Sequence, residues 1–294
     1  MKGAKIALCV LVFLGALCLT LYPLVSNYLA ERYQSTAMSD YVAAVSDMDD
    51  TYRITAWQEA QDYNRRIAER AVPMDGPDAA LYLNTPESGY DDLLNLNSDG
   101  IMGYIRIPSI NIVLPIYHGV EGETLEVGVG HMAGSSLPVG GASTHAVLAA
   151  HSGLASQRMF SDLEQLQIGD MFYLSVLGET LAYEVEQILV VEPDDTSSLG
   201  IIYGEDHTTL ITCTPFGINT HRLLVRGRRA AYTKDVTEAT ALSTTAVTST
   251  WREQYIRGIT MGLCILLGGV VVPVLVWRIY RLYHPRKRYK HEKI

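Results

Sequence analysis

Two long uncharged stretches frame the chain. Residues 6–30 and residues 258–277 contain no charged side chain. A helix rises about 1.5 Å per residue, so each stretch is long enough to cross the ~30 Å hydrocarbon core of a bilayer. Pro23 and Pro273 do not argue against this, because membrane helices tolerate proline. The first stretch is also longer than the apolar run of a signal peptide, and no small-x-small cleavage site follows it. The pattern predicts one membrane span near each end, in residues 1–30 and in residues 257–294.

Between the two stretches, the first periodic pattern is helical. Tyr41, Val45, Met48 and Tyr52 recur on one face of a helix, and Glu59, Tyr63 and Ile67 continue at spacings of four. We therefore expect residues 31–70 to form a juxtamembrane helix that packs one stripe on the following domain. Proline, glycine, Asn and Asp then break the helical period, so we expect residues 71–99 to form a long, lid-like loop. The helix and this loop together make residues 31–99 one region ahead of the domain.

Residues 100–230 change to short strand-like runs separated by turn residues. Leu177-Gly178-Glu179 reads as a hairpin turn, and one helical turn or two is expected at residues 161–166. Many short strands with regular turns are typical of an all-β domain, here a closed or nearly closed β-barrel. Residues 231–256 are rich in Thr, Ser and Ala and predict a tether to the second span. The predicted strands cover residues 104–107, 111–116, 145–150, 171–176, 180–191, 208–212 and 223–226.

Charge predicts the membrane topology. Seven Lys and Arg residues and one acid, Glu292, follow Trp277, and the short N-terminus carries Lys2 and Lys5. Because Lys and Arg collect on the cytoplasmic side of membrane spans, we expect both ends inside and residues 31–256 outside. That outer part holds 13 basic and 31 acidic residues, a net charge of −18. A field of this sign disfavours nucleic acid as a partner, and an acidic, well-solvated surface explains it.

Cysteine placement singles out one thiol. Cys9, Cys18 and Cys264 lie in the two uncharged stretches, whereas Cys213 lies between them. A lone cysteine in such a domain is either a buried apolar residue or a working nucleophile, and the number of cysteines alone does not decide between the two. Cys213 ends a strand-like run and is followed closely by Pro215, a place where a fixed scaffold can present a reactive side chain.

A nucleophilic thiol needs a proton partner and an oxyanion donor, because free cysteine is only a few per cent thiolate at neutral pH. Of six histidines between the spans, His151 has the best setting, since it closes a strand-like run before Ser152-Gly153. His145 starts the same run about 20 Å away and cannot serve the same site. We expect the other five to be surface or hydrogen-bonded histidines, namely His118, His131, His145, His207 and His221.

Arg222 is the candidate donor. It follows Cys213 across a turn that contains Pro215 and Gly217, so successive strands would bring their ends together. Arginine is always charged and offers five donors, which suits an oxyanion or a peptide carbonyl; the alternative is an ordinary surface arginine. Arg226, Arg228 and Arg229 are interpreted in that second way.

Metal or cofactor chemistry is not expected. The sequence has no H-E-x-x-H and no close Cys/His pair, so zinc is improbable. Asp194-Asp195 and Glu205-Asp206 could bind calcium weakly, but solvated acidic loops explain them equally well. We therefore predict neither a cofactor nor a metal.

These residues resemble one enzyme family. Thr209-Leu210-Ile211-Thr212-Cys213 resembles the sortase signature T-L-x-T-C, His151 closes a strand before a short turn as the sortase histidine does, and Arg222 follows on the next strand. The resemblance covers residues 100–229. It implies an eight-stranded sortase barrel with His151, Cys213 and Arg222 as its catalytic residues.

Within that family, several segments resemble class C, the pilin-polymerising sortases. Examples are Gly100-Ile101-Met102-Gly103-Tyr104-Ile105 and Gly217-Ile218-Asn219-Thr220-His221-Arg222. Class C enzymes usually carry a lid with an Asp-Pro-aromatic motif. Here Asp75-Gly76-Pro77-Asp78 lacks the aromatic residue, so no lid anchor can be assigned.

The resemblance implies a membrane-bound cysteine transpeptidase that acts on pilin or surface proteins with LPXTG-like sorting signals. Cys213 would cleave the Thr–Gly amide through a thioacyl intermediate, with His151 as proton donor, and a lysine of another pilin subunit would resolve it. Two alternatives stay open: a sortase that anchors proteins to the cell wall, and a non-catalytic membrane scaffold. A papain-like protease is disfavoured, because its cysteine would precede its histidine and open a helix.

Overall fold

A computed structural model describes residues 2–71, 83, 87–154, 157–232, 257–261, 276 and 278–280. The chain divides into two compact units, Met1–Val247 and Thr248–Ile294. In the second unit, the described residues are helical. Most of the predicted second span, the basic tail and residues 233–256 of the predicted tether lie outside the described residues, as does Asp75-Gly76-Pro77-Asp78.

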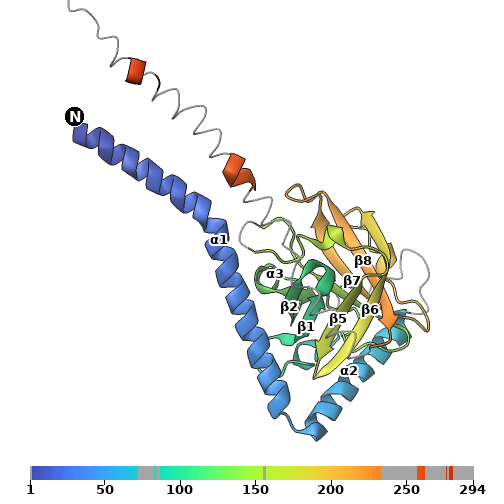
Figure 1. The fold of residues 1–294 in the computed structure, drawn as a ribbon. Coiled ribbons are helices and arrows are strands. Elements are labelled where there is room, and N and C mark those ends of the chain that lie inside the picture. Colours follow the sequence, from blue (N-terminus) through green and yellow to red (C-terminus); the bar gives the residue numbers. More distant parts are fainter. Residues whose placement is uncertain are drawn as a thin grey trace, which may run out of the picture. The chain divides into compact units, whose positions relative to one another are not determined.

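Two helices precede the barrel where the sequence predicted one over residues 31–70. α1 (Lys2–Asp47) runs without a break from the uncharged stretch into the folded domain. It ends at Asp47, the chain reverses, and α2 (Asp50–Ala71) returns beside the barrel (Figure 1). The reversal moves two residues of the predicted stripe out of the packed face: Tyr52 and Glu59 are exposed, whereas Tyr41, Tyr63 and Ile67 are buried.

The first part of α1 has the character of a membrane span. Residues Phe13–Asp47 include an apolar window with very little of its surface buried by the rest of the molecule. Large apolar side chains such as Leu11, Phe13 and Leu19 are exposed. Further along, Tyr41 packs on the barrel, where its hydroxyl donates to Met102 O at 2.9 Å and accepts from Leu177 N at 2.9 Å. Among the described residues, this helix is the one candidate for a span.

Eight strands close into a barrel, which confirms the all-β barrel predicted from the sequence and the strand number implied by the family resemblance. Their order around the barrel is β1-β2-β3-β4-β7-β8-β6-β5, with β2/β3 and β4/β7 parallel and the other pairs antiparallel. The interior holds the main apolar core. The strands are β1 (Ile101–Ile107), β2 (Ile112–His118), β3 (Val129–His131), β4 (Thr144–Ala149), β5 (Met171–Val176), β6 (Glu179–Val191), β7 (Asp206–Thr214) and β8 (His221–Ala230).

Short helices and turns join the strands. At the predicted β5–β6 hairpin, Leu177 and Gly178 both have positive φ, 49° and 83°, the conformation of a tight hairpin turn. The short strand β3 was not predicted, because three residues carry no readable period. The short helices are η2 (Tyr90–Asp92), η3 (Pro108–Ile110), α3 (Gly122–Val127), η4 (Leu163–Gln165) and η5 (Ser197–Leu199).

The predicted loop over residues 71–99 is partly a packed segment. Tyr90 in η2 and Leu94 are buried in the main core. Tyr90 also donates to His131 O at 3.1 Å and accepts from Gly119 N at 3.2 Å. Residues 87–99 are therefore tied to the barrel.

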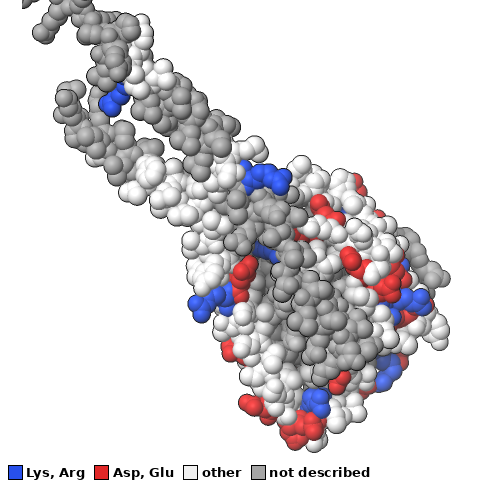
Figure 2. All heavy atoms as spheres, viewed as in Figure 1, with Lys and Arg blue, Asp and Glu red and all other residues white. Residues whose placement is uncertain are grey.

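Charged side chains of both signs lie at the surface (Figure 2). On the face in Figure 2, basic and acidic residues lie among one another. Many form ion pairs, such as Arg226 with Glu186 at 2.7 Å and Arg228 with Glu205 at 2.9 Å. The arginines interpreted as ordinary surface residues are thus paired with acids.

Candidate active site

The parallel pairing of β4 with β7 brings the candidate histidine to the candidate thiol. Ala149 lies opposite Ile211, so two further residues along each strand bring His151 level with Cys213. Two hydrogen bonds extend the pairing past the end of β4. Ala150 N donates to Ile211 O at 3.1 Å, and Thr212 Oγ1 donates to Ala150 O at 2.8 Å.

Arg222 stands directly opposite Cys213. The two are paired Cα partners in the antiparallel ladder of β7 and β8. The Arg222 guanidinium donates to the carbonyls of His221 at 3.2 Å and Asn219 at 3.4 Å, which holds it against the β7–β8 turn. His151, Cys213 and Arg222 are all partly exposed, so a substrate can reach them.

Strand alternation puts the three side chains on one face. Side chains two residues apart on a strand point the same way. Val147, Ile211 and Leu224 form a small apolar cluster outside the main core, and the three candidates continue the same alternation along β4, β7 and β8. Leu83, from the segment before the barrel, packs into this outer cluster. The three candidates therefore share one surface of the barrel, and the apolar cluster around Val147, Ile211 and Leu224 lies next to them.

Loops around the candidates are braced against one another. Phe160 N donates to His151 O at 3.0 Å, and Gly153 N donates to Ser161 Oγ at 3.1 Å. Gly153 has φ +78°, and a Cβ there would lie 3.0 Å from Gly217 N, so the turn after His151 meets the turn after Cys213 closely.

A further brace was not foreseen from the sequence. Thr214 Oγ1 donates to the Glu164 carboxylate at 2.5 Å and ties the end of β7 to η4. Glu164 carries no local motif, so no signal in the sequence could have found it.

The five other histidines have structural partners. His145 is buried, with ring nitrogens 2.9 Å from Gly200 O and 2.7 Å from Thr209 Oγ1. His131 is buried, with ring nitrogens 2.8 Å from Tyr90 Oη and 2.8 Å from Ser136 O. Desolvation lowers the pKa of each to about 4. His118 contacts the carbonyls of Gly100 and Leu93, His207 pairs with Glu186, and His221 pairs with Glu192.

Three of the four acidic residues considered for calcium, Asp195, Glu205 and Asp206, have partners within the chain. Asp206 accepts from Gly141 N at 2.9 Å and from Tyr183 Oη at 3.0 Å. Asp195 accepts from Ser197, which lowers its pKa. Within the described part of the chain, no group of three His, Cys, Asp or Glu side chains is arranged to hold a metal ion.

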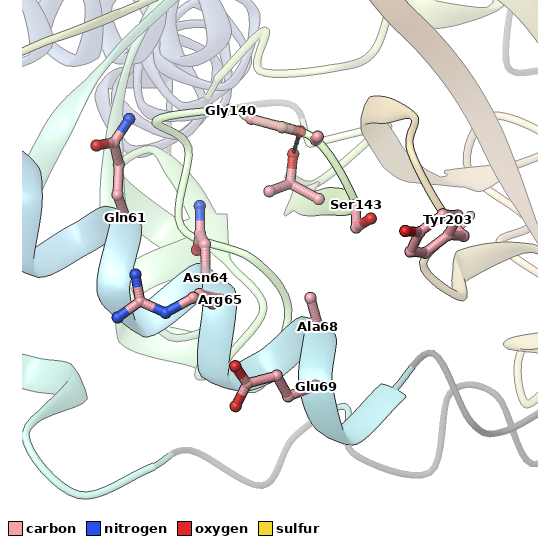
Figure 3. Close-up of a pocket in the computed structure, with 11 residues that line it drawn as sticks. Gln61, Asn64, Arg65, Ala68, Glu69, Gly140, Ser143 and Tyr203 are labelled. Atoms are coloured by element: carbon pink, nitrogen blue, oxygen red, sulfur yellow. Dashed lines mark hydrogen bonds between the residues drawn. The ribbon is translucent and has the colours of Figure 1, made fainter.

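One groove in the described part of the chain lies away from these residues. It has a volume of about 520 Å³ and runs between α2 and the loop over residues 140–144 (Figure 3). Gln61, Arg65 and Glu69 form one wall, and Gly140 and Ser143 lie on the other. Since β4 begins at Thr144 and runs toward His151, this groove is at the opposite end of the strand from the candidate residues. None of the three lines it.

Comparison with known proteins identifies similar chains that are sortases. A sequence model described as the sortase domain matches residues 105–230. The crystal structure of sortase C1 from Streptococcus agalactiae is 43% identical, and the match covers 67% of this chain and 100% of that one, with a TM-score of 0.61. Sortase C of Streptococcus pneumoniae is 40% identical, and the match covers 68% of this chain and 98% of that one, with a TM-score of 0.59. A Clostridium perfringens sortase C is 43% identical, and the match covers 67% of this chain and 100% of that one, also with a TM-score of 0.59.

Curated relatives agree over shorter segments. Sortase D of Bacillus subtilis is 32% identical over 130 residues, which is 43% of this chain and 63% of the relative. Sortase A of Streptococcus agalactiae is 32% identical over 117 residues, 39% of this chain and 47% of the relative. The chain thus spans less than two thirds of each of these two relatives. With the full-length match to the sortase C structures, the barrel and its Thr209–Cys213 run lead to one conclusion: this chain belongs to the sortase family of cysteine transpeptidases.

Proposed function

We propose that this chain is a pilin-polymerising sortase with Cys213 as nucleophile, His151 as proton donor and Arg222 as oxyanion or carbonyl donor. The observation that carries the proposal is the strand register, which brings these three residues level on one face at one end of the barrel. A thiol, an imidazole and a guanidinium so placed fit nucleophilic acyl transfer.

The reaction proceeds in two steps, formation of a thioester on Cys213 and transfer of the acyl group to an amine. The Cys213 sulfur attacks the carbonyl carbon of the Thr–Gly amide in an LPXTG-like sorting signal. The C–N bond breaks, His151 donates a proton to the leaving amine, and a thioester to Cys213 remains. A lysine amine of another pilin subunit then attacks the thioester, an isopeptide bond forms, and the amine's proton restores the Cys213–His151 pair.

Similar proteins support a sorting-signal substrate. The Clostridium perfringens sortase C was solved with the C-terminal cell wall sorting motif, and the Streptococcus pneumoniae structure is described in terms of pilin substrate specificity. Identity of about 40% to sortase C structures over two thirds of this chain favours the same substrate class here.

A membrane location fits the same proposal. α1 is a candidate span, and the basic residues at both ends of the chain favour cytoplasmic termini. The barrel would then face the extracytoplasmic side, where surface proteins are assembled. The second span, in residues 258–277, is part of this proposal.

Mass spectrometry of products tests the proposal. The full chain in detergent is mixed with a pilin subunit that carries a sorting signal, and Cys213→Ala serves as the matched control. Covalent subunit dimers with a Thr–lysine isopeptide bond are expected from the wild type and from it alone. Dimers made by Cys213→Ala would refute the assigned nucleophile. Transfer to a cell-wall peptide amine with no dimers would identify a cell-wall anchoring sortase instead, and no thioacyl adduct at all would leave a non-catalytic scaffold.

A further inference from the structure

The membrane-proximal helix contacts the segment that returns from His151. In α1, Gln34 is buried, and its Nε2 lies 3.2 Å from Val127 O, 3.5 Å from Gln157 Oε1 and 3.6 Å from Met159 Sδ. Gln157 Nε2 in turn donates to Glu126 O. Two side-chain amides therefore join α1, the end of α3 and residues 157–159.

The same segment holds the backbone of His151. Phe160, directly after Met159, donates its N–H to His151 O at 3.0 Å. On its other side, Arg158 pairs with Asp162 at 2.6 Å and donates to Ile110 O at 2.5 Å, which fixes the segment to η3. A displacement of residues 157–160 would therefore reach the His151 carbonyl through one hydrogen bond.

Met159 has a backbone conformation that needs support. Its φ is +39°, in the left-handed region that residues with a side chain rarely adopt, and it is buried. Such a conformation persists when the surrounding contacts hold it, and these residues often cluster at functional sites. The Gln34 amide supplies one of the contacts to Met159, through its sulfur.

We propose that Gln34 is a positioning residue for the active site: it holds residues 157–160 against α1 and thereby sets the placement of His151 opposite Cys213. The inference rests on the proposed roles of those two residues. It assigns the helix that leaves the membrane a part in catalysis, as a fixed support for the histidine, in addition to anchoring. Gln34 touches neither the thiol nor the substrate in this role.

Two substitutions separate the hydrogen bonds from the packing of the side chain. Gln34→Ala removes both, whereas Gln34→Met keeps most of the volume and loses the N–H donors. Ser35→Ala is the matched control, because Ser35 is the next residue of α1 and is exposed. All are made in the full chain in detergent, and their melting temperatures are compared with the wild type.

The readouts are kcat and KM on a sorting-signal peptide and the pH dependence of Cys213 alkylation by iodoacetamide. Loss of one partly buried hydrogen-bonded group predicts a fall in kcat of about three- to tenfold in both Gln34 variants, with KM little changed. The alkylation profile should shift as well, because the thiol reports its imidazole neighbour without any substrate. Ser35→Ala should match the wild type in both readouts.

A double-mutant cycle with Gln157→Ala tests the contact route. If the two amides act as one brace, the double variant should be little worse than either single variant. Additive effects on kcat, or wild-type kcat and alkylation in a folded Gln34→Met, would overturn the proposal. Failure of the proposed function is distinct: the wild type would then lack turnover and would share its alkylation profile with His151→Ala.

Discussion

The three candidate site residues depend on neighbouring strands to bring their side chains together. A free thiol is mostly protonated near neutral pH, so the nucleophile role proposed for Cys213 requires a base and a donor beside it. His151 follows the end of β4 and Arg222 lies in β8, and these strands are the two neighbours of β7 in the barrel. The hydrogen bond from Thr212 to Ala150 O joins the residues directly before Cys213 and His151, which limits how far those two can separate.

Arg222→Lys should be severely impaired although it keeps the charge. Arginine presents a planar fork of donors, whereas lysine offers one compact ammonium on a flexible stem. Loss of one fixed oxyanion donor typically costs about 10²–10³ in turnover, and we expect a fall in kcat of that order. Steady-state kinetics on a sorting-signal peptide measures it. Arg226→Lys on the same strand is the control, since Arg226 pairs with Glu186 away from the site; equal kinetics for the two variants would remove Arg222 from the mechanism.

Elements ahead of the barrel pack on different parts of it: α1 contacts β1 and β2, and α2 contacts β4. α1 and α2 meet at the turn after Asp47 and diverge from it (Figure 1), and the chain then contributes Leu83 to the outer cluster beside the candidate site. Residues 87–99 are bound into the core through Tyr90 and Leu94. Leu83 is therefore the described residue of the predicted loop that lies beside the candidate site, and removal of the whole predicted loop would damage the core as well.

Leu83→Asp should speed the reaction of Cys213 with a small thiol reagent. Burial of a carboxylate in an apolar cluster costs several kcal/mol, so the substituted residue should leave Val147, Ile211 and Leu224. If this part of the chain covers the site, the thiol becomes more accessible. Alkylation rates with iodoacetamide are compared with those of Val190→Asp, a control at an exposed position. Unchanged labelling would indicate a site that is open in the resting enzyme.

At the scale of the whole molecule, the buried histidines link stability to pH. His131 and His145 have pKa values of about 4 in the folded chain, because burial disfavours the charged ring. The ordinary histidine pKa is about 6.5, so between about pH 6.5 and 4 the unfolded chain binds more protons than the folded one. The contribution of these two histidines to the free energy of unfolding should therefore be lost as the pH falls below about 6.5.

Each of these histidines can remove up to about 1.4 kcal/mol of the free energy of unfolding per pH unit in that window. Urea unfolding at pH 7.5, 6.0 and 5.0 measures the effect before most carboxylates titrate. His145→Gln should reduce the slope, because Gln cannot take up a proton. A free energy of unfolding that does not change between pH 7.5 and 5.0 would contradict the burial of these rings in neutral form.

The proposed topology also belongs to the whole molecule. Protease added to intact protoplasts should digest the barrel and spare an epitope placed after Lys293, because basic residues collect at both ends of the chain. Lysed protoplasts are the control that shows the epitope to be cleavable. Loss of the epitope from intact protoplasts would place the C-terminal tail outside.

Local properties of the chain were enough to determine several features of this protein. Four features depend on near neighbours: the length of an uncharged run, the two-residue period of most strands, the hairpin at Leu177-Gly178 and the Thr209–Cys213 run. The barrel class and the candidate first span could therefore be predicted from the sequence, and His151, Cys213 and Arg222 could be named as candidates. Other features depend on contacts between distant segments. Only the tertiary structure decided the parallel pairing of β4 with β7, the three-residue strand β3, the reversal between α1 and α2, and the contacts of Glu164 and Gln34 around the site. Parallel partners and side-chain braces join residues far apart in sequence, and packing of the whole barrel selects them, which no local pattern encodes.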